Sequence, residues 1–245
     1  MDLTLLTCNY NTPDLIVNLL KSVKATCHKL PKVVVMDTSP KRSNILTDLE
    51  IPNYFLPGGT HGDAVNLGMD EVKTNYVLLV DSDVIFLQDF NPAFEKFKQF
   101  NVTLMGNVVG NCAGKSLHPR VEPWFCFMDL EVLKTHNIKF FDKERTRKSK
   151  LEGKRVYDIG STMFEDVLRE DLPIGNCNME NKYFKHYGGM SWHVPKFNGN
   201  DGDTDIDFGG THPHLGLLNH GLRIQAQYKE DVRVLEDVEI KGIFK

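Results

Sequence analysis

Short apolar runs alternate with helical segments over about residues 1–105, and this alternation constrains the fold more than any other feature. The runs Leu3–Thr7, Lys32–Asp37 and Tyr76–Val80 have the length and composition of buried strands. Between them, helical spacing predicts a helix that begins at Pro13 and another over about residues 63–72. Strands that alternate with helices predict an α/β fold, in which helices flank a mostly parallel central sheet.

Polar residues follow each of these predicted strands, at Asn9, at Asp37, and at Asp81 with Asp83. The carboxyl ends of parallel strands meet at one edge of the sheet, where ligands bind in open α/β sheets. Two carboxylates one residue apart at such an edge can converge on a hard divalent cation, Mg2+ or Mn2+. The same pair can instead cap backbone N–H groups in a turn, and these residues alone leave both interpretations open.

The composition excludes several classes of protein. Of 245 residues, 41% are hydrophobic and 25% are charged, which argues against disorder. The formal net charge of -4 gives no overall attraction to nucleic acid or anionic lipid. The apolar runs are much shorter than the roughly 18 residues of a transmembrane span, and the N-terminus lacks the basic start of a signal peptide. The five cysteines are scattered, so we expect reduced thiols and a cytoplasmic protein, or one of the host cytoplasm if the source is a virus.

The alternation weakens in the second half of the chain. A strand followed by a helix that starts near Asp129 is predicted first, and another helix lies within residues 159–171. Residues 143–155 are rich in Lys and Arg and predict a surface loop, and residues 198–210 are rich in Gly and Asp and predict a mobile loop. No internal repeat or linker stands out, so we predict a single domain over residues 1–245.

Four motifs follow one another in a telling order: "TCNYNTPD" after the first strand, Asp37 after the second, Ala64-x-Asn66-x-Gly68 in a helix, and an apolar strand running into Asp81, Ser82 and Asp83. With the later "HYGGMSW", this order resembles the family 2 glycosyltransferases, which have the GT-A fold. The resemblance is good over about residues 1–105 and looser to about 192. It implies an inverting, metal-dependent enzyme that moves a sugar from a nucleotide-diphosphate sugar, with a UDP-sugar favoured, to an acceptor hydroxyl.

The resemblance implies a nucleotide-sugar-binding half over about residues 1–105 and an acceptor-binding half over about residues 106–245, which ends in a C-terminal lid. The donor-binding residues that it implies are Thr7, Asn9, Asn11, Asp37, His61, Gly62, Asp63, Asn66, Asp81 and Ser82. Among them, Asp37 would hydrogen-bond the base. Gly62 would leave room for the backbone to approach a phosphate.

The resemblance also implies a Mn2+ or Mg2+ ion held by Asp83 and Asp81, with His186 as the third ligand. His212 and His214 remain rivals for that third position. The Asp-rich loop that precedes them lacks the glycine at the sixth position and the glutamate at the twelfth position of a calcium-binding loop, and we interpret it as a lid.

An inverting transferase needs a carboxylate that accepts the proton of the attacking hydroxyl. We assign this role to Asp158, which follows a short apolar stretch, and keep Glu165 and Asp166 as alternatives. Trp124, Asp129 and Trp192 are the predicted acceptor-side residues. The basic residues of the 143–155 stretch are most simply a solvated surface; if functional, they would suit a polyanionic acceptor: a glycan, a lipid-linked carrier or nucleic acid.

Two other functions fit parts of the pattern. A sugar nucleotidyltransferase shares the fold but typically carries glycine and a basic residue in its first loop, and "TCNYNTPD" has neither. A non-catalytic sugar- or nucleotide-binding module would have no need of Asp81 together with Asp83.

Overall fold

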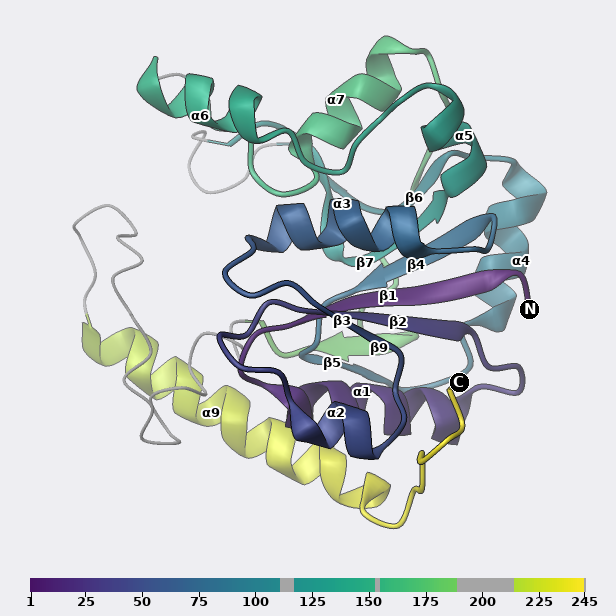
Figure 1. The fold of residues 1–245 in the computed structure, drawn as a ribbon, viewed down its shortest axis with the longest axis vertical. Coiled ribbons are helices and arrows are strands. Elements are labelled where there is room, and N and C mark those ends of the chain that lie inside the picture. Colours follow the sequence, from purple (N-terminus) through teal and green to yellow (C-terminus); the bar gives the residue numbers. More distant parts are fainter. Residues whose placement is uncertain (111–116, 153–154, 189–213, 245) are drawn as a thin grey trace.

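The computed structural model describes residues 1–110, 117–152, 155–188 and 214–244, with side chains from residue 223 onward in the last range. A central sheet of seven strands has the order β3-β2-β1-β4-β7-β6-β8 (Figure 1). These strands are β1 (Leu3–Asn9), β2 (Lys32–Asp37), β3 (Asn53–Phe55), β4 (Tyr76–Val80), β6 (Leu104–Val109), β7 (Arg120–Asp129) and β8 (Ile174–Asn176). Strand β7 is antiparallel to both neighbours and the other pairs are parallel, so the predicted mostly parallel sheet is confirmed.

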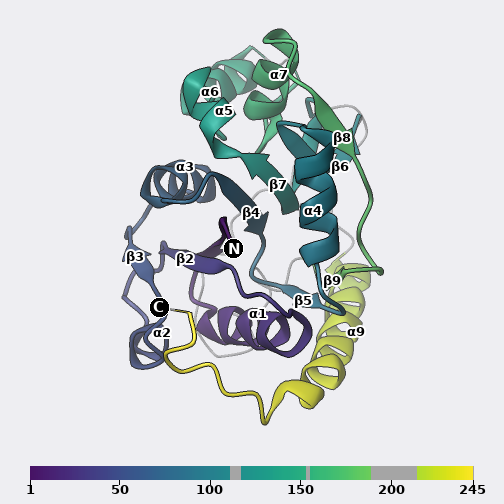
Figure 2. The ribbon, with the colours of Figure 1, turned by 90° about the vertical axis from the view of Figure 1, so that its right-hand side faces the viewer.

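Helices cover both faces of this sheet. They are α1 (Pro13–Thr26), α2 (Asn44–Asp48), α3 (His61–Glu71), α4 (Asn91–Phe100), α5 (Leu130–Thr135), α6 (Lys143–Leu151), α7 (Ser161–Arg169) and α9 (His214–Val232). Strand residues alternate between two apolar cores, with Leu5 and Leu78 in one and Leu6 and Leu79 in the other. Helices α1 and α4 contribute to the first core and α3, α5 and α7 to the second; Figure 2 shows the strands between these groups.

The parallel strands β1, β2 and β4 end at the same edge of the sheet, on the side away from the chain's N-terminus in Figure 1. Register pairs Asn9 with Asp37 at the ends of β1 and β2. Strand β4 ends at Val80, immediately before Asp81. The predicted polar edge is therefore present, and it lies where ligands bind in sheets of this kind.

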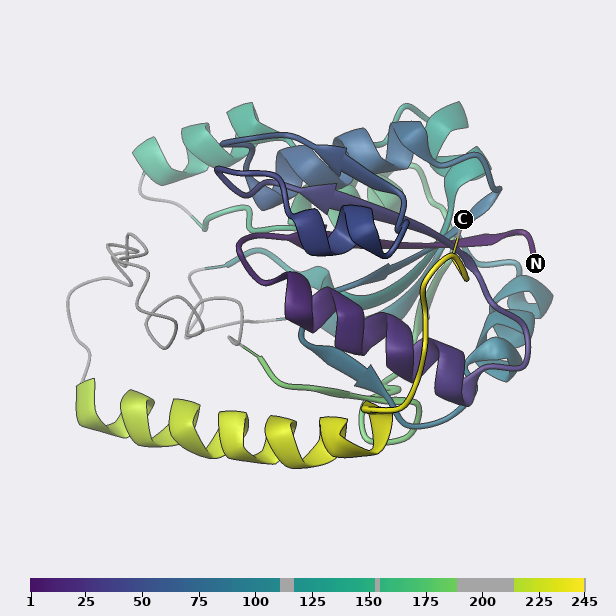
Figure 3. The ribbon, with the colours of Figure 1, turned by 60° about the horizontal axis from the view of Figure 1, so that its bottom comes forward.

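A second, two-stranded sheet stands beside this edge. It pairs β5 (Val84–Phe86) with β9 (Phe184–His186) in antiparallel register. Helix α9 runs alongside α1 in Figures 1 and 3 and lies next to this small sheet. Its Tyr228 packs in one apolar cluster with Leu15 of α1, Ile85 of β5 and Tyr187.

The prediction of a loop over residues 143–155 is wrong, because Lys143–Leu151 forms helix α6. Asp142 caps the first turn by accepting hydrogen bonds from the backbone N–H groups of Glu144 and Arg145. Lys and Arg are good helix formers, and Glu144 pairs with Arg147 one turn later. A high density of positive charge therefore did not prevent a helix once it was capped.

Among the helices that the structure describes, none combines the length and the apolar character needed to cross a membrane.

Candidate functional site

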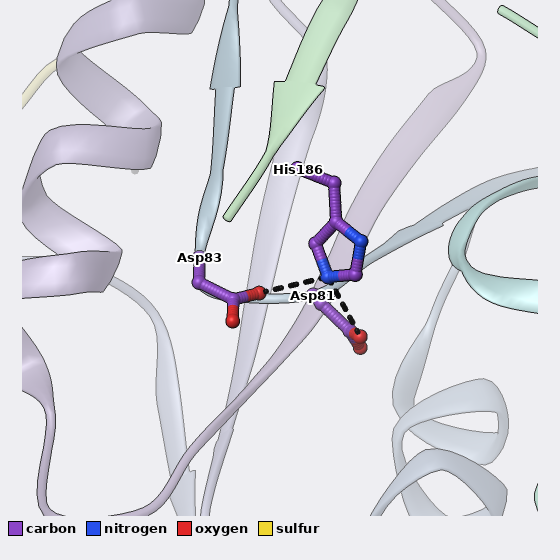
Figure 4. A group of neighbouring side chains, drawn as sticks. All are labelled: Asp81, Asp83 and His186. Atoms are coloured by element: carbon purple, nitrogen blue, oxygen red, sulfur yellow. Dashed lines mark ion pairs between the residues drawn. The ribbon is translucent and has the colours of Figure 1, made fainter. Parts of the chain in front are cut away.

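Asp81, Asp83 and His186 converge at the carboxyl edge of the sheet (Figure 4). One ligand atom from each lies within 4.8 Å of the other two. His186 Nε2 is 3.3 Å from Asp83 Oδ1 and 3.9 Å from Asp81 Oδ2. Within the described ranges, this is the one group of three or more metal-ligating side chains that comes together so closely.

Strand pairing explains how residues about a hundred positions apart in the chain meet here. Register places His186 opposite Val84, directly after Asp83, and the N–H of Tyr187 donates to the carbonyl of Asp83 at 3.0 Å. The indole of Trp124 stacks on the His186 ring, with centroids 5.2 Å apart and planes 24° apart. The histidine is thus fixed by its backbone and by one ring face.

Burial and neighbouring charges shift the pKa of Asp81 and the pKa of His186. Burial raises the pKa of Asp81, and the charge of Asp83 adds to this rise while His61 and His186 oppose it. Burial lowers the pKa of His186, but its hydrogen bond to Asp83 and the two carboxylate charges outweigh burial, so the pKa is raised overall. The group therefore favours bound protons, which a cation can replace.

These side chains fit a divalent cation. Carboxylate oxygens are the ligands that Mg2+ and Mn2+ prefer, and a neutral imidazole is a common further ligand of transition metals. The three donors converge from different directions in Figure 4, as coordination of one ion requires. This geometry favours the metal-binding interpretation over a turn in which both aspartates cap backbone groups.

Asn9 and Asp37, two predicted donor-binding residues, form a closed network instead of facing solvent. Both are fully buried, and the Asn9 amide donates to Asp37 Oδ1 at 2.8 Å. The same oxygen accepts from the backbone and hydroxyl of Ser39, and Asp37 Oδ2 accepts from the backbone N–H of Ser43. The Ser39 hydroxyl in turn accepts from the N–H of Asn11. Asp37 thus holds the loops after β1 and β2, and its contact with a base stays a prediction.

The first two turns of α3 carry four predicted donor-binding residues. His61 Nε2 lies 4.0 Å from Asp81 Oδ1, so this histidine does join the site. Asp63 accepts from the Thr60 hydroxyl at 2.7 Å, and the Asn66 amide exchanges two hydrogen bonds with the backbone of Phe141. Thr60 caps α3 by accepting from the N–H of Asp63, and the Asp63 carboxylate holds the Thr60 hydroxyl in place. Asn66 fastens α3 to the segment that leads into α6.

Gly62 is needed for a reason other than the expected one. A Cβ at this position would stand 2.3 Å from the Phe141 ring, so only glycine lets that ring pack against α3. The structural requirement is the close packing of two segments, and an approach to phosphate stays a prediction.

Thr7 lies near the carboxyl end of β1, and Ser82 lies between Asp81 and Asp83. Both are buried, and the Thr7 hydroxyl is without a hydrogen-bond partner among the described residues. A buried hydroxyl without a partner is costly, which makes Thr7 a candidate for a ligand contact.

Asp158, the predicted base, forms an ion pair with Arg120 at the start of β7. Arg120 also holds Glu122, with 3.1 Å between Arg120 Nη2 and Glu122 Oε2. The negative charge of Glu122 also raises the pKa of Asp81, although by less than burial and the charge of Asp83 do. The Glu122 carboxylate therefore lies near the metal-ligating group. The sequence analysis missed Arg120 and Glu122, because their signal appears only when β7 pairs with β4.

The alternative base residues are engaged elsewhere. Arg145 of α6 pairs with both Glu165 and Asp166 of α7. These two carboxylates therefore tie α6 to α7.

The acceptor-side predictions have mixed outcomes. Trp124 stands beside His186, as described above. Asp129 is paired with Tyr76, at the far edge of the sheet from Asp81, and its side chain caps α5 by accepting from the N–H of Val132. The structure therefore does not support an acceptor role for Asp129.

Trp192, His212 and the loop over residues 198–210 lie outside the described residues. His214 begins α9, and its side chain is also outside them. Their predicted roles stay predictions.

Residues 4–170 match the model of the family Glycosyl transferase family 2. This match spans more than half of the chain, so the chain belongs to that family, as the order of its motifs predicted. No curated protein matches the sequence.

Several solved structures have a similar fold. Residues 1–349 of TarS from S. aureus, in complex with UDP, give a TM-score of 0.53 at 19% identity over 76% of this chain and 60% of that one. PcManGT, a mannosyltransferase from Pyrobaculum calidifontis with GDP-Man and Mn2+, gives 0.51 at 11% identity over 99% and 86%. A Bacillus anthracis structure described as a glucose-1-phosphate thymidylyltransferase gives 0.50 at 13% identity over 85% and 98%. At these identities the likeness establishes the fold.

Proposed function

We propose that this protein is an inverting, metal-dependent glycosyltransferase that moves a sugar from a nucleotide-diphosphate sugar to an acceptor hydroxyl. The observation that carries the proposal is the convergence of Asp81, Asp83 and His186 at the carboxyl edge of the sheet, in a chain of glycosyl transferase family 2. A binding module without catalysis has no need of such a group.

Asp83, Asp81 and His186 would hold a Mn2+ or Mg2+ ion, which when bound supplies positive charge to the diphosphate leaving group. His61, next to Asp81, lies where it can donate to a phosphate oxygen. The buried network around Asp37 fixes the loops that would receive the nucleoside, and the Thr7 hydroxyl has hydrogen-bonding capacity left for it.

We assign the general base to Asp158. Its carboxylate would accept the proton of the acceptor hydroxyl while the oxygen attacks the anomeric carbon from the side opposite the diphosphate. One carbon–oxygen bond forms as the bond to the diphosphate breaks, and the configuration inverts. Arg120 pairs with both Asp158 and Glu122, and Glu122 lies near Asp81, so this connection to the metal-ligating group supports the assignment. Glu165 and Asp166 instead pair with Arg145 and join α6 to α7.

The donor is proposed to be a UDP-sugar. TarS has been crystallised with UDP and with UDP-GlcNAc, and PcManGT with GDP-Man and Mn2+, so proteins of similar fold take nucleotide sugars. This chain spans 60% of the TarS fragment, and donor choice here rests on the proposal. The proposal also includes the division into donor-binding and acceptor-binding halves, the C-terminal lid and the cytoplasmic location.

The acceptor is proposed to be polyanionic. Helix α6 presents exposed basic side chains, among them Lys143, Arg147, Lys148 and Lys150. Asn66 and Phe141 join α3, which begins beside Asp81, to the segment that leads into α6. Positive charge on this helix would attract phosphate groups of an incoming glycan, lipid-linked carrier or nucleic acid.

A sugar nucleotidyltransferase is the second candidate, because one similar structure is described as a thymidylyltransferase. The loop Asn9–Thr12 argues against it. This loop has neither glycine nor a basic residue, and Asn9 Oδ1 instead accepts from the N–H of Thr12.

A thermal-shift panel of nucleotide sugars, with and without Mn2+, tests the proposal. We expect a Mn2+-dependent rise in melting temperature with one nucleotide and its sugar, followed by release of the nucleoside diphosphate when an acceptor mixture is added. Release of pyrophosphate from a nucleoside triphosphate and a sugar phosphate would instead identify a nucleotidyltransferase. Absence of a shift with every donor would overturn the assignment of a nucleotide-sugar donor.

A further inference from the structure

We propose that Asp231 of helix α9 is a positioning residue that holds His186 in place for metal binding. This inference rests on the proposed metal site. It goes beyond the ligand set itself, because it assigns a role to a carboxylate far along the chain that binds Lys185, Tyr187 and Gln227.

The contacts of β9 divide between its two sides. Phe184 and His186 face the aromatic side chains of β7, where Phe184 stacks on Phe125 with centroids 4.4 Å apart. Lys185 and Tyr187 alternate with them and turn toward α9. Both residues that flank the histidine ligand are thus available to a partner on the opposite side of the strand.

One carboxylate oxygen of Asp231 accepts hydrogen bonds from both Lys185 and Tyr187. Its Oδ2 accepts from Lys185 Nζ at 2.6 Å and from the hydroxyl of Tyr187. Its Oδ1 accepts from the Gln227 amide one turn earlier in α9, at 3.0 Å. A single carboxylate therefore fixes the residues before and after His186, and its own orientation is fixed by Gln227.

Helix α9 and the turn that follows it are bonded to α1, so the position of Asp231 is fixed relative to the main sheet. Asn18 of α1 donates to the Tyr228 hydroxyl at 3.0 Å, and Lys21 donates to the carbonyl of Leu235 at 3.1 Å. The ring of Tyr228 meets that of Tyr187 edge to face, with centroids 5.0 Å apart. The chain of contacts runs from α1 through α9 to β9.

The physical consequence concerns preorganisation. An imidazole must present its ring nitrogen in one direction to complete a metal site, and groups that fix a ligand change metal affinity without touching the ion. Trp124 limits the ring from one side, and Asp231 limits the backbone that carries the ring. Loss of the Asp231 contacts frees residues 185–187 and makes metal binding pay for their ordering.

The test is a calorimetric titration of the purified chain with Mn2+ alone. We expect Asp231→Asn to weaken Mn2+ binding about tenfold, since it weakens the pairing with Lys185 while keeping the size of the side chain. Tyr187→Phe, which removes one hydroxyl and keeps the ring, should weaken binding by a smaller factor. The matched control is Asp89→Asn: Asp89 binds His28 and Asn91, away from β9, and its loss should leave the affinity unchanged.

The double variant with His186→Ala distinguishes positioning of the histidine from a general effect of Asp231 on structure, because Mn2+ affinity is compared with and without the imidazole. If Asp231 acts through the histidine, then Asp231→Asn adds no further loss of affinity in a His186→Ala background. A further tenfold loss there, or unchanged affinity in the single variant, would overturn the positioning role. These results differ from a failure of the proposed function, in which the unmodified chain binds no Mn2+ or His186→Ala has no effect.

Discussion

Two buried aspartates stand at the same edge of the sheet, Asp37 after β2 and Asp83 after β4, with β1 between their strands. Asp37 is surrounded by neutral donors: the Asn9 amide, the backbone N–H and hydroxyl of Ser39, and the backbone N–H of Ser43. Asp83 has a second carboxylate two residues away and a titratable imidazole 3.3 Å distant. The two sites have similar burial and opposite surroundings.

This difference in surroundings suits Asp37 to a structural role and Asp83 to metal binding. Neutral donors that come mostly from neighbouring loops compensate the carboxylate of Asp37 and need no external ion. The compensation of Asp83 and Asp81 includes a proton on His186, and a proton can be exchanged for a metal ion. Three measurements test this difference between Asp37 and Asp83.

The largest effect is expected from Asp83→Asn. It removes a charged ligand, so sugar transfer should fall by at least about a hundredfold and the Mn2+-dependent thermal shift should disappear. The metal-free fold should survive, because the change removes one of two like charges from a buried group. Steady-state assays and melting curves, with the exposed Asp70→Asn as control, check this. Transfer within a few fold of the unmodified rate would show that the group is not the metal site.

Asp37→Asn should act on stability instead. An amide has one acceptor oxygen, so donors now bound by both carboxylate oxygens would lose partners, at a cost of about 1–3 kcal/mol in the free energy of unfolding. Urea denaturation with and without Mn2+ measures this, and the exposed Asp48→Asn serves as control. The increment in stability from Mn2+ should be retained. If stability is unchanged and metal stabilisation is lost, the two aspartates have the reverse roles.

The smallest effect is a dependence of stability on pH. Folding raises the pKa of His186 above 6.5, so its protonation stabilises the metal-free fold fully below about pH 6.5, and this stability is lost as pH rises through the raised pKa. Asp81, raised above 3.8, has the same sign at lower pH. The slope is at most about 1.4 kcal/mol per pH unit for one proton.

Saturating Mn2+ should reverse this trend, because the ion needs the neutral imidazole and binds better as pH rises. Unfolding free energies measured from pH 6 to 8, with His186→Gln as control, provide the test. Persistence of the slope in that variant would assign the titration to another group.

Sequence reasoning succeeded where local pattern determines structure. Tyr76–Val80 is a continuous apolar run before two carboxylates, and it forms a buried central strand that ends at Asp81. His186 was expected as the third ligand from the family resemblance, and the structure brings it to both aspartates. The family was identified from the order of motifs, and the family match confirms it.

It failed where a residue's meaning depends on distant partners. Asp129 was expected beside an acceptor, but the antiparallel direction of β7 carries it to the other edge of the sheet. For Gly62 the approach to a phosphate stays a prediction, but the sequence did not reveal that the missing side chain makes room for the ring of Phe141, some eighty positions away. The basic stretch was expected to be a loop, and its cap at Asp142 makes it helix α6.

The strands, their polar ends and the pair of aspartates can be read from short stretches of sequence, because hydrophobic periodicity and turn chemistry are local. Which polar groups compensate each carboxylate depends on the tertiary fold. The pairing of β5 with β9 placed an imidazole against Asp83, the loop after β2 closed neutral donors around Asp37, and α9 brought Asp231 behind the histidine. Electrostatic compensation depends on distances between groups, and only the folded chain sets those distances.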